Sequence, residues 1–250
     1  MRYLMRIGIF CFAVSILGGC TESSSAPSQG GSVVIMRTQP DISTVHSTPS
    51  GVLTAGAGVD SLQVTQAVFS AQNFMLRSDI SDEIPDPNLA EGFIHLGSFL
   101  LAFDIGGIQY IGQNVIFAAT YRRARFDIQP IHASADSLAQ LFGPYASLFA
   151  SGGSVSPSTI IIKGFVWKNG FQLPFTYSTA LSGSGSIPFD TPLVVPAGGA
   201  PMEVRVRLTT ATAFTDKNGS LMDPRDFGNA AAIDANIKTS LKAALLGSGS

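Results

Sequence analysis

Residues 160–177 decide the fold class, and they read IIIKGFVWKNGFQLPFTY. Two apolar runs, 160–167 and 171–177, flank the tripeptide Lys-Asn-Gly at 168–170. Asn and Gly tolerate the positive φ that both central positions of a type I′ turn require, so Asn-Gly between two such runs predicts a β-hairpin. The chain therefore contains at least one pair of antiparallel strands.

Strand patterns continue on both sides of this hairpin. Residues 59–76 alternate between apolar and polar with a break in phase near Phe69, which indicates one long strand with a bulge or two strands. The two glycines within 105–108 predict a hairpin that joins strand 93–103 to strand 108–117. Further strands are predicted at 120–128, with Tyr121, Arg123, Arg125 and Asp127 on a wet face, at 202–214, and as a short edge strand at 193–195. Residues 77–92 and 181–186 are predicted to be an acidic surface loop and a Gly/Ser loop.

Two helices are predicted to accompany the strands. One is a short helix within a crossover connection at 134–150. The other is a C-terminal amphipathic helix at 230–246, whose apolar face carries Ile233, Ile237, Leu241 and Leu245 and whose wet face carries Lys238 and Lys242. These elements predict a mainly β fold: an antiparallel β-sandwich, immunoglobulin-like or transthyretin-like, with a short crossover helix and a C-terminal amphipathic helix.

The composition is typical of a β-rich extracytoplasmic domain and argues against several function classes. Charged residues make up 13% of the chain, and the densest basic cluster, at 122–125, is too small to form a stripe that binds nucleic acid. The sequence contains no P-loop, no GxGxxG and no GxSxG. Nucleotide chemistry and the nucleophile elbow of α/β-hydrolases are therefore not indicated.

The first twenty residues have the layout of an export signal followed by a lipid attachment site. Arg2 and Arg6 precede an apolar run at 7–17 that is too short to be a permanent transmembrane helix. Leu-Gly-Gly-Cys at 17–20 resembles the lipobox of bacterial lipoproteins, in which the cysteine thiol receives diacylglycerol and becomes the first mature residue. Cys20 is therefore the expected lipidation site. Cys11 would leave with the signal, and the loss of two arginines would change the formal charge from −2 to −4.

The expected organisation has three parts. They are a lipoprotein signal peptide at 1–19, a lipidated N-terminus with a flexible tether at 20–50, and a single β-sandwich domain with the C-terminal helix at 51–250. Thr21 follows the cysteine, and by resemblance to the sorting rule of enteric bacteria it implies the outer membrane, with the domain facing the periplasm or the cell surface. No cofactor is expected, because the mature chain would keep no free thiol and shows no cofactor motif.

Four stretches resemble a family of uncharacterised bacterial lipoproteins with a single β-sandwich domain. They are FLLAFD at 99–104, AATYRRARF at 118–126, IIIKG at 160–164 and LMDP at 221–224. At the start of the second stretch, Phe-Ala-Ala at 117–119 stands where the family has Pro-Ala-Gly. The resemblance implies a fold and an envelope location, and it implies no catalytic residues.

Histidines and the lone tryptophan are the first candidates for chemistry or binding. His46, His95 and His132 have none of the spacings of a zinc site. Trp167 lies beside the Asn-Gly turn, where an exposed ring would stack on a sugar; ordinary packing within the strand is the alternative.

A second candidate is a weak cation site between the last predicted strand and the C-terminal helix. Asp216, Asn218 and Asp223 place oxygen ligands within one short segment, as a calcium loop does. The glycine comes at the fourth place instead of the sixth, and no glutamate closes a twelve-residue loop. A plain turn is therefore favoured over a metal site.

The expected function is a membrane-anchored, non-enzymatic binding or adhesion module of the cell envelope, with a protein or glycan ligand at the cell surface. One alternative stays open: an envelope hydrolase or redox accessory protein whose site is built from scattered Asp, Ser and His. A cleft that joins His95 or His132 to carboxylates would favour that alternative.

Overall fold

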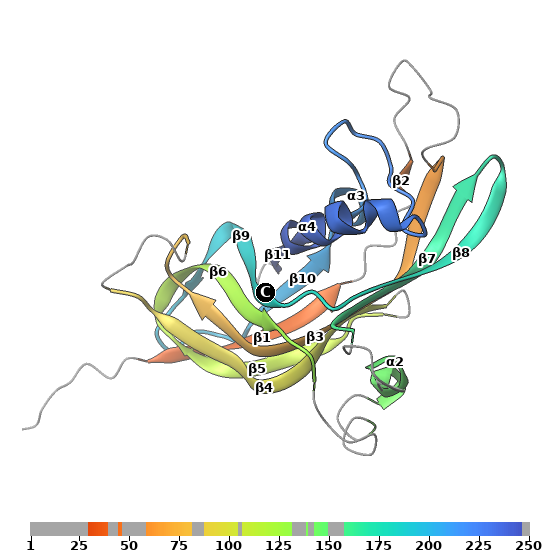
Figure 1. The fold of residues 1–250 in the computed structure, drawn as a ribbon. Coiled ribbons are helices and arrows are strands. Elements are labelled where there is room, and N and C mark those ends of the chain that lie inside the picture. The colour runs from red at the N-terminus through yellow and green to blue at the C-terminus, as the bar shows by residue number, and fades with distance from the viewer. Residues whose placement is uncertain are drawn as a thin grey trace, which may run out of the picture.

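The computed structural model describes residues 30–39, 45–46, 59–81, 88–104, 107–131, 139, 143–149 and 158–246. The strands are β1 (Gly31–Gln39), β2 (Val45–His46), β3 (Ser61–Arg77), β4 (Glu91–Asp104), β5 (Tyr110–Phe117), β6 (Ala119–Ile128), β7 (Ile160–Lys168), β8 (Phe171–Thr179), β9 (Gly183–Val195), β10 (Met202–Leu208) and β11 (Leu241–Leu246). The helices are η1 (Gly143–Tyr145), α2 (Ala146–Phe149), α3 (Thr210–Ala213), η2 (Phe227–Asn229) and α4 (Ala230–Ser240). Strands dominate and form two open sheets (Figure 1), so the expected mainly β sandwich class is confirmed.

Strand β3 organises the larger sheet. One edge pairs with β4, and the other pairs with two strands placed end to end, β7 and then β6. At the junction Ser70 donates its backbone N–H to the Thr159 carbonyl (2.7 Å) and its hydroxyl to the Gln129 carbonyl (2.6 Å). Asn73 has a φ of 54° where the register with β4 shifts, which marks a bulge. The long bulged strand predicted from 59–76 is therefore confirmed.

The smaller sheet has the order β5-β1-β10-β11, and a single residue pair between β11 and β9, Ala243 with Phe189, joins it to the larger sheet. Strand β9 pairs along its length with β6, which in turn pairs with β3. The β1–β10 and β9–β11 pairings are parallel. The expectation of purely antiparallel sheets is therefore wrong in these two places, because β1 and β11 pair with strands far away in the sequence.

The main core lies between the sheets and includes large side chains that are fully buried, among them Phe69, Phe74, Tyr121, Phe126 and Phe214. A second, small cluster covers the outer face of the larger sheet, where Phe149 of α2 packs with Val68, Ala102 and Ile161. Both faces of β3 are covered at this level, which explains why residues 67–71 are buried without alternation. The predicted crossover helix is confirmed at 146–149; residues 132–138 and 140–142 lie outside the described part.

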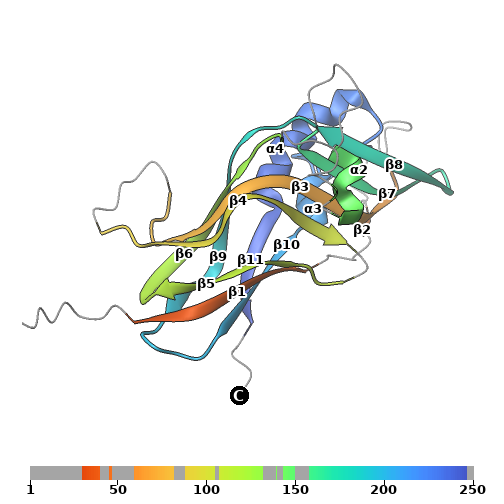
Figure 2. The same ribbon diagram turned by 90° about the horizontal axis from the view of Figure 1, so that it is seen from below.

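The Asn-Gly hairpin is formed as predicted. Asn169 and Gly170 have φ of 53° and 78°, and Lys168 pairs with Phe171 across the two-residue turn. Positive φ at both central positions defines the type I′ geometry. Figures 1 and 2 show this β7–β8 hairpin projecting beyond the two sheets.

The hairpin predicted at 105–108 is borne out only at its turn: Asp104 and Gly107 form an isolated antiparallel bridge, in which the Gly107 N–H donates to the Asp104 carbonyl at 3.1 Å. The two strands do not continue as a hairpin. Strand β4 pairs with β3, whereas β5 pairs with β1 of the smaller sheet. The two strands still lie close together without a ladder: a Cβ on Gly112 would stand 2.9 Å from the Ile94 carbonyl oxygen, and the Asn114 amide donates to the Phe93 carbonyl at 2.8 Å. The chain therefore crosses between the sheets after β4, and glycine at 112 permits the close approach.

Two predictions for 181–195 are also wrong. The Gly/Ser segment belongs largely to β9, and 193–195 is the end of that long strand, paired with β6, instead of a separate edge strand. A Cβ on Gly185 would stand 2.4 Å from the ring of Phe126. Because Gly185 has no side chain, the ring of Phe126 can pack directly over β9. The Gly/Ser composition of residues 181–186 does not distinguish such a strand from a loop.

The C-terminal helix is shorter than predicted: α4 has 11 residues and ends six residues before the predicted end at 246. Ile233 and Ile237 are fully buried on α4, as expected. The helix ends at Ser240, whose hydroxyl donates to the Asn236 carbonyl, and whose own carbonyl accepts the Thr209 N–H at 2.7 Å. The residues that follow, including Leu241 and Leu245, form β11 and pair with β10.

The ordered fold begins earlier than residue 51. Strand β1 lies between β5 and β10, and its alternating residues Val34, Met36 and Thr38 are fully buried. The expected tether at 20–50 is therefore too long at its C-terminal end. The signal segment and Cys20 lie outside the described residues. Among the residues that are described, no helix has the length and hydropathy needed to span a membrane.

Candidate functional site

The outer face of the β7–β8 hairpin carries the exposed aromatic residues that best fit a binding site. On β7, Phe165 and Trp167 are partly exposed, whereas Val166 between them is fully buried. Residues that pair directly across a sheet share a face. Phe165 therefore lies beside Pro174 and Trp167 beside Gln172, both exposed residues of β8.

The same face continues onto β3. Gln63 is the partner of Phe165 on that side, and it is partly exposed. The rings of Phe165 and Trp167 lie 6.4 Å apart at an interplanar angle of 54°. We call these five residues, Gln63, Phe165, Trp167, Gln172 and Pro174, the hairpin face. Two flat apolar rings flanked by amide donors and acceptors suit a ligand that offers both C–H faces and hydroxyl groups.

The hairpin is held to the rest of the fold by a polar contact with α4. The Tyr177 hydroxyl donates to the Asp234 carboxylate at 2.6 Å and lies 3.0 Å from the Ala230 carbonyl. Thr179 donates to the other carboxylate oxygen at 3.0 Å. Burial, and then the neighbouring Asp234 carboxylate, raise the pKa of Tyr177 above its ordinary value, so the phenol stays protonated and keeps donating.

The weak calcium candidates form a turn. The Asp216 carboxylate accepts the backbone N–H groups of Asn218 and Ser220, both at 2.8 Å. Asp223 is instead engaged by the Arg225 guanidinium in two hydrogen bonds of 2.9 and 2.7 Å. The Arg225 hydrogen bond lowers the pKa of Asp223 despite its burial. The favoured turn is therefore present, and the two carboxylates serve separate internal contacts.

Two of the three histidines lie among the described residues. His46 is exposed on β2, and the His95 ring lies against Phe99 with centroids 5.0 Å apart. His132 lies outside the described part of the chain. Within the described ranges, no group of three or more His, Cys, Asp or Glu residues is placed to hold a metal ion.

The most unusual electrostatic feature is a buried cluster that sequence reasoning missed. Arg123 and Asp79 form two hydrogen bonds of 3.1 and 2.9 Å, and each side chain is only 4% exposed. Arg77 donates to the same carboxylate at 3.1 and 3.0 Å and lies 3.5 Å from Glu91. Burial would raise the pKa of Asp79, but the two guanidinium groups outweigh it and hold that pKa below its ordinary value.

This cluster corrects two sequence predictions. Asp79 was expected in a wet acidic loop and Arg123 on a wet strand face, yet both are buried. The register between β6 and β9 shifts between Tyr121 and Arg123, so Arg123 and Ala124 are buried in succession. A bulge within the arginine-rich strand breaks the alternation, and nothing in the sequence marks its position.

No family model, curated protein or solved structure matches this chain.

Proposed function

We propose that this protein is a lipid-anchored lipoprotein of the bacterial outer membrane that acts as a non-enzymatic binding module. Cys20 carries the lipid, and the hairpin face binds a glycan of the cell envelope. The sequence of residues 1–20 supports the anchor, because charge, apolar run, small residues and cysteine follow in the order that export and lipidation require.

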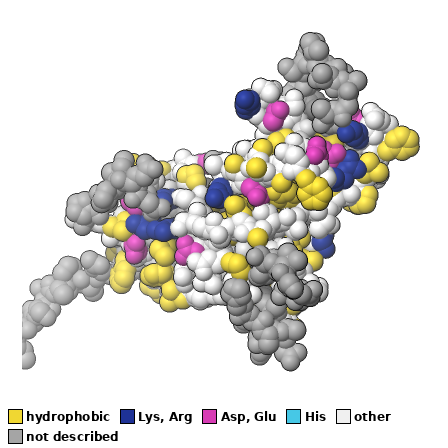
Figure 3. All heavy atoms as spheres, viewed as in Figure 1, with side chains coloured by type: hydrophobic (Ala, Val, Ile, Leu, Met, Phe, Trp, Pro, Cys, Tyr) yellow, Lys and Arg dark blue, Asp and Glu magenta, His cyan; other side chains and the backbone are white. Residues whose placement is uncertain are grey.

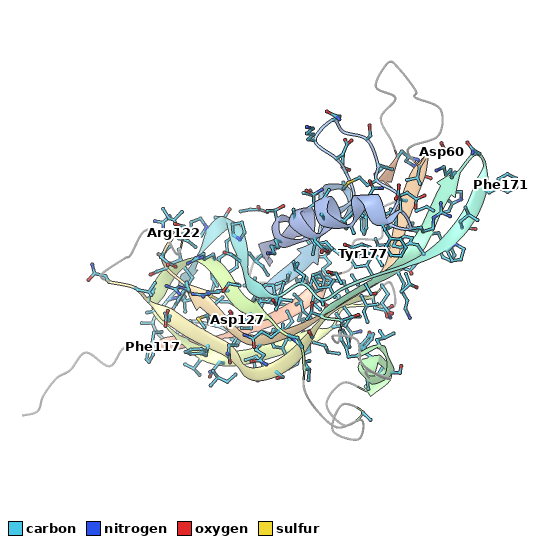
Figure 4. All side chains as sticks on the ribbon, in the orientation of Figure 1. Asp60, Phe117, Arg122, Asp127, Phe171 and Tyr177 are labelled. Carbon is cyan, nitrogen blue, oxygen red and sulfur yellow. The ribbon has the colours of Figure 1, made fainter. Side chains whose placement is uncertain are left out.

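The end of the fold next to the proposed anchor and the end that carries the hairpin face lie far apart, which supports separate anchoring and binding roles. Strand β1 begins at Gly31, eleven residues after Cys20. Figure 4 shows Phe117, the β5 partner of Gly31, at one end of the molecule and Phe171, at the hairpin tip, at the other. An anchor that holds the first end near a membrane leaves the hairpin pointing away from it.

The single observation that carries the binding role is the hairpin face itself. Phe165 and Trp167 present ring surface on a sheet that projects from the body, with Gln63 and Gln172 beside them. Sugars bind such surfaces because their axial C–H groups pack on a ring while their hydroxyl groups bond to side-chain amides. A rigid two-stranded platform loses little entropy on binding.

The anchor is tested by Cys20→Ser. Without the thiol no thioether to diacylglycerol can form, so we expect the variant to incorporate no labelled fatty acid, and to persist as precursor or to be released. Metabolic labelling with a fatty acid, followed by gel fluorography, measures this directly. Persistence of label on the variant would contradict the anchor.

The binding role is tested with the intrinsic fluorescence of Trp167, the chain's one tryptophan. We expect soluble cell-wall glycan fragments to change its emission in a saturable way. Phe165→Ala keeps the reporter and removes the neighbouring ring, which should weaken binding about two- to tenfold, as expected for a ring contact of about 0.5–1.5 kcal/mol.

Phe227→Ala is the matched control, since Phe227 is a strongly exposed aromatic residue outside the hairpin face. It should bind the fragments as the parent does. Emission that stays constant with every glycan fragment, or equal losses in both variants, would contradict the glycan ligand and leave a protein as the partner to seek.

A further inference from the structure

Three segments far apart in the sequence meet at the end of the molecule where β1 begins. The Ala118 N–H donates to the Gly30 carbonyl, and the Gly198 N–H donates to the Gly31 carbonyl, both at 3.3 Å. Ser32 donates its hydroxyl to the Pro196 carbonyl at 2.7 Å and accepts the Gly199 N–H at 2.9 Å. We call this surface, residues 30–34, 114–120 and 193–202, the base rim.

The base rim is apolar and uncharged. Three large apolar side chains are exposed on it: Val115 (61%), Phe117 (55%) and Val194 (59%). None of its residues is Asp, Glu, Lys or Arg, although such residues make up 13% of the chain. Figure 3 shows hydrophobic side chains at this end of the molecule, with charged side chains beside them. Exposed apolar side chains that cluster in this way mark a contact surface.

Polar groups at the start of β1 have hydrogen-bond partners within the protein. Ser32 is 2% exposed and both donates and accepts, and the Gly30 and Gly31 carbonyls accept hydrogen bonds across the rim. Buried polar groups that already have partners do not need water. The rim can therefore leave water for a less polar surrounding at low cost.

We propose that the base rim rests on the lipid bilayer, with Phe117, Val115 and Val194 in the headgroup–acyl boundary. This rests on the proposed lipid anchor. Nine residues, 21–29, link Cys20 to Gly30, and even a fully extended link of ten Cα–Cα steps reaches at most about 35 Å. The rim is the surface at which that short link ends, so the bilayer is the partner that the anchor holds against it.

This contact fixes the orientation of the whole domain. The acyl chains supply the attachment, and the base rim supplies a second, weaker contact that limits rotation about the link. The charged residues that flank the rim in sequence are Arg122, which is exposed, and Glu203, which pairs with Arg205 at 3.0 Å and with Arg37 at 3.4 Å. The hairpin face then points away from the membrane.

The test uses the full-length lipidated protein in vesicles of phosphatidylcholine, with and without bromine on the acyl chains. In a Trp167→Phe background, Phe117→Trp places the only tryptophan on the rim, and Phe171→Trp places it on the hairpin tip. Both native side chains are exposed aromatic rings, so the two variants are matched. Val115→Trp is a second rim reporter if the first fails to fold.

Brominated lipid should quench the rim tryptophans several-fold more strongly than the tryptophan at position 171. If mass spectrometry shows that the protein carries its lipid but tryptophan at 117 or 115 is not quenched, the rim contact is wrong and the anchor stands. Equal quenching at the rim and at the hairpin tip would have the same meaning. A protein that lacks the lipid mass and stays in solution would overturn the anchor, and the rim contact with it.

Discussion

Replacing Asp79 with asparagine should lower the free energy of unfolding by about 3–5 kcal/mol, because it leaves the buried Arg123 guanidinium without its counter-charge. Asp79 is the shared acceptor of Arg123 and Arg77, so the variant would also bring two positive groups together without the carboxylate between them. Urea unfolding followed by circular dichroism measures the change. A midpoint within error of the parent would show that the cluster contributes nothing to stability.

Glu91→Gln is the matched control for this prediction. Glu91 contacts Arg77 at 3.5 Å and is 39% exposed, so water screens the pair and its loss should cost at most about 1 kcal/mol. The double variant Asp79→Leu with Arg123→Met removes both buried charges together. It should be more stable than Asp79→Leu alone, because no unpaired guanidinium is left at position 123, while Arg77 keeps its contact with Glu91.

The same cluster makes the free energy of unfolding depend on pH in the acid range. The guanidinium groups of Arg123 and Arg77 hold the pKa of Asp79 in the folded protein below its ordinary value. A carboxylate with a depressed folded pKa contributes stability that is present above the unfolded pKa and is lost as the pH falls through the folded value. The parent should therefore lose stability below about pH 4, and Asp79→Asn should lose less over the same interval.

The sequence pattern was sufficient to predict strands and turns where the residues in contact are close together in the sequence. The type I′ turn at 169–170 depends on two residues that tolerate positive φ, and those residues are visible in the sequence. The long strand at 61–77 was visible from its alternation, but the break in phase near Phe69 reflects cover on both faces of β3, and the bulge against β4 lies at Asn73. Long-range pairing has no such signature, which is why β5 was assigned to β4 although it pairs with β1.

The chain from 230 to 246 shows why a regular spacing can mislead. Ile233, Ile237, Leu241 and Leu245 recur every four residues, which predicts one helix. The free edge of β10 provides a ladder of hydrogen bonds for residues 241–246, and tertiary pairing overrides a weak helical preference. The spacing is correct for α4 and coincidental in β11.

The candidate site was predictable only in part. Trp167 could be singled out because it stands beside a hairpin turn. Phe165, two residues earlier on the same predicted strand, shares its face by alternation. Gln63 could not be placed with them, because β3 and β7 pair across about a hundred residues of sequence. The Asp79–Arg123 pair was missed for a similar reason: its two members are 44 residues apart, and a bulge turns one of them inward.

Ile237→Asp should destabilise the domain by at least about 3 kcal/mol. Ile237 is fully buried on α4, in the main core. The substitution loses apolar burial worth about 1.5–3 kcal/mol and places a carboxylate in apolar surroundings, which adds a desolvation cost. Urea unfolding measured by circular dichroism should show a lower midpoint for the whole sheet signal, since an isolated helix of this length is marginal and depends on packing.

Lys238→Asp tests whether the effect comes from packing and not from helix composition. Lys238 is the next residue on α4 and is exposed. The substitution introduces the same side chain in the same turn, so the change in helix propensity is similar. Its change of charge near the C-terminus is larger, −2 against −1 for Ile237→Asp, yet on an exposed position the expected cost is about 1 kcal/mol or less. If the two variants unfold at the same urea concentration, α4 does not stabilise the sheets. If only Ile237→Asp lowers the midpoint, and does so in one transition, α4 and the two sheets unfold as one cooperative domain.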